Sequence, residues 1–554
     1  MQSSASRVNE NVDAPSNSSS NYAIRLNQTV QAEIASSRDQ DWFSVELKAG
    51  QTYTFAMVGT GAEMLQGSTL TLIGKDGRTT LAANDSGLPN GHALITFTAK
   101  ESGTYYLSAK GSDGLRGEYG ISATEGRKAK MDADMLAGLL QQAGSWSDTR
   151  GEGTVVTVGF RQSSNDDEFK NFSRFTDQQK KIAIKLLKGV EEFTGLKFKI
   201  VNAQGYTNDA SILFGNYSEK DGLGGFGYYP GEEDGDHRAG DIWINKAGSD
   251  GLDFIQMHEL AHALGLSHPG HYDATNGNRI TYNNSAQITQ DSYTETVMSY
   301  FDGSATGDKL GKILTMRPSD MLALQLMYGA NMETRTGNDT YGFHSNLKGI
   351  YSFTAKSQAT LVIWDAGGRD RLDLSGFRQN QMITLEDGGL SNVAGFRQNL
   401  GIAHGAFIEE AIGGWGDDRM FGNDRANLLD GRAGHDRLFG GAGNDRLIGG
   451  AGNDILKGGS GDDRLLAGPG VDRLFGGGEA DTFVITRGVD RAIIGDFQDG
   501  QDQIDLSSLN ISFAHVLKNA EQDGKNTVLH LAGDVTVELL GVAKLDLDRD
   551  DFIF

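Results

Sequence analysis

The sequence predicts a multidomain protein, with an N-terminal β-sandwich, a central α+β domain and a C-terminal parallel β-roll that continues into further short strands. Three observations lead to this prediction. Short runs of alternating apolar and polar residues fill residues 21–125, helix-type and strand-type patterns mix over residues 126–330, and a nine-residue repeat occupies residues 413–484. The 554 residues are also too many for one compact core.

Composition excludes several classes of function. The formal net charge of -24 disfavours nucleic acid or an anionic membrane as a partner, because phosphate groups would repel this surface. The chain has no cysteine, which excludes disulfides, cysteine-ligated zinc and a thiol nucleophile. No run approaches about eighteen apolar residues, so we expect no stable membrane insertion.

The N-terminal segment divides into a polar tail and a run of strands. Residues 1–20 have no basic start and no apolar stretch, so we expect a disordered tail that is not a signal peptide as written. Residues 21–125 contain several alternating segments separated by turn signals such as KAG and KDG, which is typical of a small sandwich. These segments are DWFSVEL, QTYTFAMV, STLTLIG, ALITFTA and GTYYLSA.

Helices and strands mix in residues 126–330. The run FTDQQKKIAIKLLKGVEEFTG predicts a long amphipathic helix with Thr176 as its N-cap, and MDADMLAGLLQQAG predicts a shorter one. TVVTVGF, KFKIV, SILFGNY and DIWIN read as strands. This mixture predicts an α+β domain.

Residues 331–554 are dominated by the glycine-rich nonapeptides. Position eight of each repeat is apolar, and position six is acidic with one exception, Asn427. Glycines allow a tight turn, while the apolar residue points inward from a short strand and stacks on its counterparts. A random Gly/Asp linker would not keep an apolar residue at position eight.

Acidic turns of this kind predict calcium binding through carboxylates and backbone carbonyls. Without cations the stacked acids would repel one another, so we expect the roll to need Ca²⁺ to fold. The expected calcium ligands are Asp418, Asp436, Asp445, Asp454, Asp463, Asp472 and Asp481.

The stretch HELAHALGLSHPG at residues 258–270 predicts a metal site. His258 and His262 are four residues apart and share one helical face, and Gly265 can end the helix so that His268 reaches the same ion. Three imidazoles suit Zn²⁺ and leave a fourth position for water. Glu259 can take the water's proton and pass it to a leaving amine, so the set predicts peptide hydrolysis.

The longer pattern HExxHxxGxxH is the metzincin pattern, which also requires a methionine turn. TETVMSYFD supplies Met298, followed by Tyr300. With FTDQQ, LFGNY, LMYGAN and the segment 360–377, the chain from about residue 130 to 554 resembles the serralysins, secreted metzincin proteases with a calcium-binding roll.

This resemblance implies roles for particular residues. His258, His262 and His268 would bind catalytic zinc, Glu259 would be the general base, and Tyr300 would be a movable further zinc ligand or a stabiliser of the oxyanion. The segment GGFGYYP would be the substrate strand, pairing with an extended peptide by β-augmentation. Its residues are Gly225, Phe226, Gly227 and Tyr228.

The resemblance also implies a route and a location. Serralysins leave the cell through a type I ABC-transporter channel, directed by an uncleaved C-terminal signal, and the ending DFIF is similar to theirs. An ordinary C-terminal strand is the alternative reading of these four residues. We expect a secreted, extracellular monomer that acts on proteins and peptides.

The first 125 residues depart from the family pattern, because serralysins usually have only a short propeptide there. DQDWFSVELKAGQTYTF resembles bacterial pre-peptidase β-sandwich domains. Its role stays open between the inhibitory prosegment of a zymogen, a folding aid, a binding module and a folded appendage.

Two other functions fit parts of the sequence. One is a calcium-dependent binding or adhesion protein with an inactive protease domain, and the intact Glu259 argues against it. The other is a repeat-bearing lipase, and the absence of a G-x-S-x-G elbow argues against that.

Overall fold

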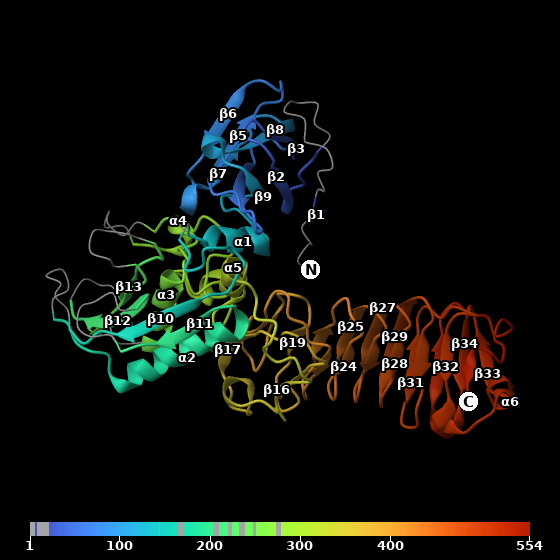
Figure 1. Cartoon of the computed structure of the whole chain (residues 1–554). Helices are drawn as coiled ribbons and strands as arrows, with labels where there is room; N and C mark the ends of the chain where they lie inside the picture. Colours follow the sequence, from blue (N-terminus) through green and yellow to red (C-terminus); the bar gives the residue numbers. More distant parts are fainter. Residues whose placement is uncertain are drawn as a thin grey trace. The chain divides into compact units, whose positions relative to one another are not determined.

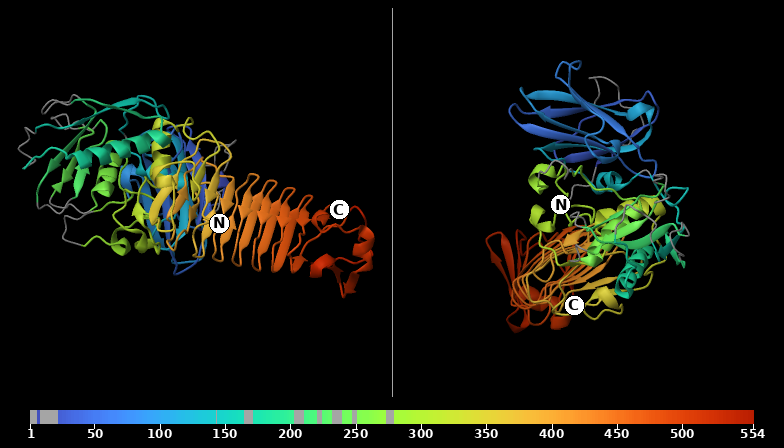
Figure 2. Two further views of the ribbon diagram at one scale, coloured as in Figure 1. Left: turned by 90° about the horizontal axis from the view of Figure 1, so that it is seen from below. Right: turned by 90° about the vertical axis from the view of Figure 1, so that its left-hand side faces the viewer.

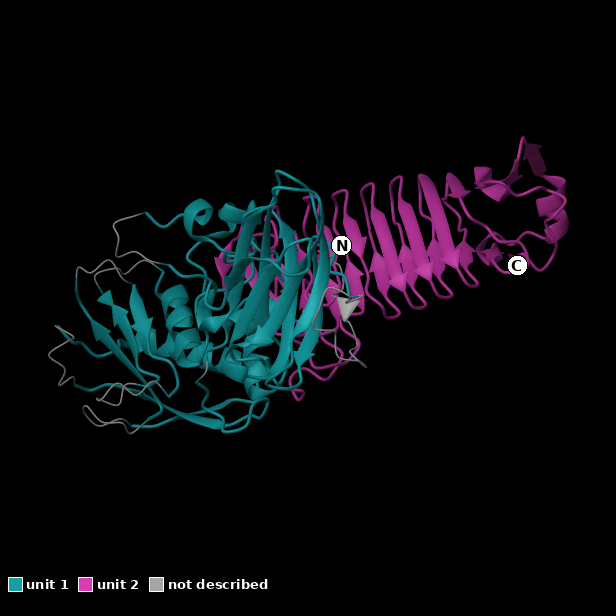
Figure 3. Cartoon of the chain, turned by 90° about the horizontal axis from the view of Figure 1, so that it is seen from above, with its two compact units in different colours: residues 1–308, 315–331 teal, residues 309–314, 332–554 magenta. Residues whose placement is uncertain are grey.

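A computed structural model gives the structure of the protein. It describes residues 6–7, 22–142, 144–163, 171–202, 210–219, 224–231, 239–246, 251–272 and 279–554. The chain forms two compact units, one of residues 1–308 and 315–331 and one of residues 309–314 and 332–554 (Figure 3). Domain boundaries at residues 20, 125 and 330 stay predictions.

The N-terminal sandwich consists of two antiparallel sheets, at the blue end of the chain in Figure 1. Their facing sides bury one apolar core that includes Phe43, Tyr53, Phe55, Leu70 and Leu107. The five predicted strands are all confirmed. One sheet has the order β2 (Gln28–Ile34), β9 (Gly117–Glu125), β4 (Thr52–Gly59) and β7 (Ala93–Thr98), and the other has β3 (Asp41–Leu47), β8 (Gly103–Gly111), β5 (Ser68–Ile73) and β6 (Thr80–Asn84).

The predicted disordered tail of residues 1–20 lies outside the described residues except at Ser6–Arg7. These two form β1, which pairs in parallel with β2.

The central part of the first unit holds helices around a five-stranded mixed sheet. The order is β11 (Lys197–Ile200), β10 (Val155–Phe160), β12 (Ile212–Tyr217), β14 (Ile242–Asn245) and β13 (Gly225–Gly227), and only β13 runs antiparallel to its neighbour. The helices are α1 (Ala133–Leu140), α2 (Asp177–Phe193), α3 (Leu252–Ala263), α4 (Tyr282–Ser285) and α5 (Pro318–Tyr328). Thr176 caps α2 as predicted, in a capping box with Gln179.

The second unit is built around two nine-stranded sheets (Figure 2). Successive nonapeptides contribute strands to the two sheets in turn, and each strand pairs in parallel with the strand one full coil away. The first sheet contains β16 (Thr340–Gly342), β18 (Arg371–Asp373), β22 (Glu410–Ile412), β24 (Leu428–Asp430), β26 (Arg446–Ile448), β28 (Arg464–Leu466), β30 (Thr482–Val484), β32 (Gln503–Asp505) and β36 (Phe552–Ile553).

The second sheet of the roll ends in an antiparallel hairpin. It contains β19 (Met382–Thr384), β23 (Arg419–Phe421), β25 (Arg437–Ala442), β27 (Ile455–Ser460), β29 (Val471–Gly478), β31 (Arg491–Ile494), β35 (Thr536–Leu539), β34 (Asn526–His530) and β33 (Ala520–Asp523). A four-stranded sheet of β15 (Lys312–Ile313), β17 (Ala359–Ile363), β21 (Leu400–Ile402) and β20 (Leu390–Ser391) precedes the nonapeptides. The helix α6 (Phe513–Lys518) follows them.

Position eight of the nonapeptides forms the core of the roll, as predicted. All eight side chains are fully buried: Met420, Leu429, Leu438, Leu447, Leu456, Leu465, Leu474 and Phe483. Among the described residues, no helix has the length and apolar character needed to cross a bilayer.

Candidate metal centre

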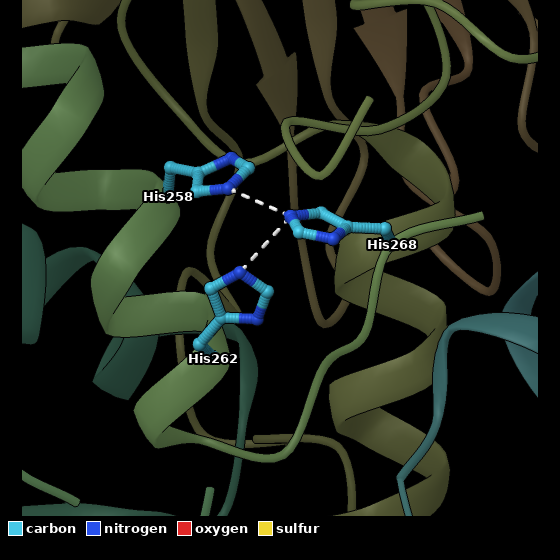
Figure 4. A group of neighbouring side chains, drawn as sticks. All are labelled: His258, His262 and His268. Carbon is cyan, nitrogen blue, oxygen red and sulfur yellow. Dashed lines mark hydrogen bonds between the residues drawn. The ribbon is translucent and has the colours of Figure 1, made fainter. Parts of the chain in front are cut away.

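Three histidines converge on one point. His258 and His262 lie on α3, and the chain then turns through Gly265, whose φ of +101° is left-handed, so that His268 faces the helix. The Nε2 of His268 lies 3.2 Å from the Nε2 of His258 and 3.2 Å from that of His262 (Figure 4). The structure therefore brings together the three predicted ligands.

Backbone carbonyls orient two of these rings. The Nδ1–H of His258 donates to the Val297 carbonyl oxygen at 2.8 Å, and that of His262 donates to Leu266 at 2.7 Å. A carbonyl oxygen can only accept, so each Nε2 keeps its lone pair for the centre. Burial lowers the pKa of all three rings, that of His268 to about 3, which keeps them neutral.

The donor set fits zinc. Tetrahedral nitrogen ligands at zinc–nitrogen distances of about 2.0–2.1 Å lie about 3.3 Å from one another, close to the spacing of the three Nε2 atoms. Neutral imidazoles with converging lone pairs suit a cation and do not suit an apolar core.

Glu259 follows the first histidine and is 5% exposed. Burial raises the pKa of its carboxyl to about 8. A cation held by the histidines would favour the carboxylate and lower this pKa again. Such a group is suited to exchange protons near neutral pH.

Strand β13 packs directly on the helix at Glu259. A Cβ atom added at Gly227 would lie 2.4 Å from the Glu259 carbonyl oxygen, so only glycine allows this approach. β13 is the last strand of its sheet, and the Phe226 ring packs against Tyr228 at 5.7 Å between centroids. The predicted substrate strand thus borders the three histidines and Glu259.

The methionine turn supports the first histidine. Met298 is fully buried, and the carbonyl that holds His258 belongs to the preceding residue, Val297. The Asp320 carboxylate on α5 accepts a hydrogen bond from the Val297 N–H at 2.8 Å. Sequence reasoning missed Asp320, because nothing local links it to this turn.

Tyr300 lies beside the three histidines. It is 46% exposed, and its ring centroid lies 4.7 Å from that of His268. Burial and the nearby Glu259 carboxyl raise the pKa of its phenol. Tyr272 stacks on the ring at 4.5 Å and donates to the buried Asp291 at 2.5 Å, a pair that the sequence analysis did not identify.

Each aspartate of the roll has one carboxylate oxygen hydrogen-bonded to the backbone of a neighbouring coil or loop. Six of the seven position-six carboxylates accept a hydrogen bond through Oδ1 from the backbone N–H of the residue 18 positions earlier, as Asp463 does from Asp445 at 2.8 Å. The exception is Asp418, whose Oδ1 accepts from the Gln381 N–H at 2.7 Å. The Oδ2 atoms of five of them are buried with no hydrogen-bond partner: Asp436, Asp445, Asp454, Asp463 and Asp481. Such carboxylate oxygens fit Ca²⁺, which takes oxygen ligands.

The other two predicted calcium ligands differ. The Oδ2 of Asp418 accepts from the Gly414 N–H at 2.7 Å, and that of Asp472 accepts from Gly468 at 3.0 Å. The seven aspartates therefore fall into five with a buried oxygen left over and two with both oxygens engaged.

A second acidic group lies outside the nonapeptides. Asp339, Asp365 and Asp370 offer ligand atoms within 4.8 Å of one another, and the Oδ2 of Asp370 is buried with no partner. Burial raises the pKa of Asp370 to about 7. These three residues follow no repeat, so no pattern in the sequence marks them as ligands.

Comparison with known proteins identifies the family. Residues 330–550 match the model described as Peptidase M10 serralysin C terminal, and residues 39–111 match the bacterial pre-peptidase C-terminal domain. Serralysin C of Dickeya chrysanthemi is 37% identical over 348 residues, covering 59% of this chain and 70% of that protein. The chain belongs to the serralysin family.

Other serralysin-family relatives match over shorter stretches. Metalloprotease AprA of Pseudomonas entomophila is 36% identical over 52% of this chain and 64% of that protein, so the chain spans less than two thirds of it. The pre-peptidase C-terminal domain of a collagenase from Bacillus anthracis is 20% identical over 18% of this chain and 92% of that domain, with a TM-score of 0.16. This serralysin thus carries a pre-peptidase domain ahead of the segment that matches the serralysin C-terminal model.

Proposed function

We propose that the protein is a secreted zinc endopeptidase that hydrolyses peptide bonds of extracellular proteins. The observation that carries this proposal is the convergence of three neutral imidazoles, oriented by backbone carbonyls, beside the buried Glu259. The names of its relatives, which include metalloproteases, support the same reaction class.

The residues of the centre would have different roles in hydrolysis. Zinc, when bound by His258, His262 and His268, supplies positive charge that polarises a substrate carbonyl and makes a water molecule more acidic. Glu259 takes the proton of the attacking water and returns it to the amine that leaves. Tyr300 donates its O–H to the charge that develops on the carbonyl oxygen.

Substrate binding would use β13. An extended peptide that adds as a further strand beside this last strand gains backbone hydrogen bonds whatever its sequence. Its scissile bond would then lie next to Glu259, which the close approach of Gly227 brings alongside. Broad cleavage of unfolded or extended segments follows from this mode of binding.

We propose that calcium stabilises the roll. The five buried Oδ2 atoms and the group of Asp339, Asp365 and Asp370 supply oxygen ligands for it. Folding driven by extracellular calcium agrees with export of an unfolded monomer through a type I ABC-transporter channel, since mass action would fold the roll outside.

The test compares Glu259→Gln with wild type in zinc and calcium, measuring casein hydrolysis and bound zinc. The variant should keep its zinc and lose about 10²- to 10⁴-fold of the activity, because only the proton acceptor is gone. Glu152→Gln, which alters an exposed carboxylate, is the control and should match wild type. Substantial activity in Glu259→Gln would exclude Glu259 as the base, and an inactive wild type with bound zinc would favour a binding protein.

A further inference from the structure

The sandwich and the protease segment share an apolar core. Val58 on β4 and Leu88 pack with residues that follow the sandwich, and all of them are buried. The shared cluster is Ala56, Val58, Leu88, Ala129, Met131, Met135, Leu136, Leu139 and Ile288. The sandwich therefore covers part of the apolar face of α1, which carries Met135, Leu136 and Leu139.

Polar and backbone contacts fix α1 on the sandwich. Asp132 caps the helix through Oδ1, and its Oδ2 accepts hydrogen bonds from Thr29 at 2.7 Å and Gln31 at 2.9 Å on β2. A Cβ atom added at Gly138 would lie 1.9 Å from the Gly59 carbonyl oxygen, so helix and strand backbones touch there. The docking of α1 is thus specific in position.

The far end of α1 reaches the third histidine. The N–H of Ser267 donates to the Leu140 carbonyl at 2.6 Å, and the N–H of Gln142 donates to Gly265 at 2.8 Å. These bonds pair the end of α1 with the turn that carries His268. The position of His268 therefore depends on where α1 lies.

Asn90 of the sandwich joins this pairing. Its Nδ2 donates to the carbonyl oxygens of Leu139 at 3.0 Å and Gln141 at 2.9 Å, and it lies 3.0 Å from the Oγ of Ser267. The residue has φ of +60°, a conformation that asparagine tolerates better than most residues. One side chain of the sandwich thus reaches the residue next to a metal ligand.

We propose that the sandwich is a permanent part of the enzyme that holds the third histidine in place, with Asn90 as a positioning residue. Loss of the sandwich would expose Met135, Leu136 and Leu139 and free the turn before His268. The sandwich is then neither an inhibitory prosegment nor a detachable appendage. This inference rests on the proposed zinc site.

The first test measures zinc affinity, by competition with a chromophoric chelator, and thermal stability. Asn90→Gly removes the donor and keeps the left-handed backbone, and it should weaken zinc binding about tenfold, as loss of a supporting hydrogen bond does at other zinc sites. Asn90→Asp should weaken it further, because a carboxylate would face two carbonyl oxygens. Asp113→Gly changes an exposed residue with φ of +52° in a similar turn of the same sandwich and should match wild type.

Equal zinc affinity in wild type, Asn90→Gly, Asn90→Asp and Asp113→Gly would overturn the proposal. A wild type that binds zinc but hydrolyses nothing would instead refute the proposed function, and the zinc comparison would still decide this inference. A second measurement does not depend on the folding of any variant. Intact-mass spectrometry of wild type with zinc and calcium should find the chain whole while casein is cut, whereas a cut between residues 120 and 145 that raises activity would overturn the proposal.

Discussion

Removing calcium while keeping zinc should unfold residues 413–484 and leave the sandwich folded. Extracellular calcium modules have dissociation constants of about 10⁻⁴ to 10⁻³ M. At about 10 mM calcium, each site would then contribute about 1.4–2.7 kcal/mol. If each of the five buried Oδ2 atoms marks one site, the total is about 7–14 kcal/mol, as much as the whole stability of a typical domain.

The assay is a calcium titration of protein dialysed into calcium-free buffer with zinc, followed by far-ultraviolet circular dichroism and thermal unfolding. Strand signal should grow with calcium, and magnesium should not replace it, because Mg²⁺ demands tighter octahedral geometry. Asp445→Asn places at position six the residue that Asn427 already has there. The variant should lose the contribution of one site, about 1.4–2.7 kcal/mol of the free energy of unfolding, when calcium is present and nothing when it is absent. A spectrum and a melting curve that calcium leaves unchanged would refute the reasoning.

Three further predictions concern the metal centre and the roll. Tyr300→Phe should lower kcat about 10²-fold with little change in KM, because the donor acts on charge that develops in the transition state; a pure rise in KM would contradict this. Gly227→Ala should lower kcat/KM without loss of zinc, since its Cβ would lie 2.4 Å from the Glu259 carbonyl oxygen, and unchanged kinetics would remove β13 from substrate binding. Burial raises the pKa of Asp436 to about 8 and of Asp445 to about 7, so the calcium-free folded roll holds protons that the unfolded chain releases above about pH 4. The stability of the calcium-free roll should therefore fall as the pH rises from about 4 to 8. Calcium should reverse this trend, since the ion needs the deprotonated carboxylates. Circular dichroism at pH 5 and pH 8, with and without calcium, checks the direction of the pH effect in both conditions.

Local patterns predicted the elements because the forces that form them act between neighbours in sequence. Thr176 caps its helix because a hydroxyl just before an amphipathic run can reach the first free N–H groups. The histidines were also predictable, since a helix of fixed pitch and one glycine turn bring them together.

Contacts between distant parts of the chain were not predictable. Asn90 lies 177 residues before Ser267, and no local pattern marks it as a partner. The difference between Asp463 and Asp472 is equally hidden, because it depends on whether one glycine N–H turns towards Oδ2. Periodicity gives the same prediction for both residues, and only the folded turn separates them.

The alternation of nonapeptides between two sheets limits how the roll can change in length. Deleting one nonapeptide would transfer every later strand to the opposite sheet, so that β31 and β32 would each lie in the sheet that now holds the other. Deleting or inserting two nonapeptides removes or adds a full coil of 18 residues. Every later strand would then stay in its own sheet, and each position-six Oδ1 would again accept a hydrogen bond from a backbone N–H. The number of nonapeptides in related proteins should therefore differ in steps of two.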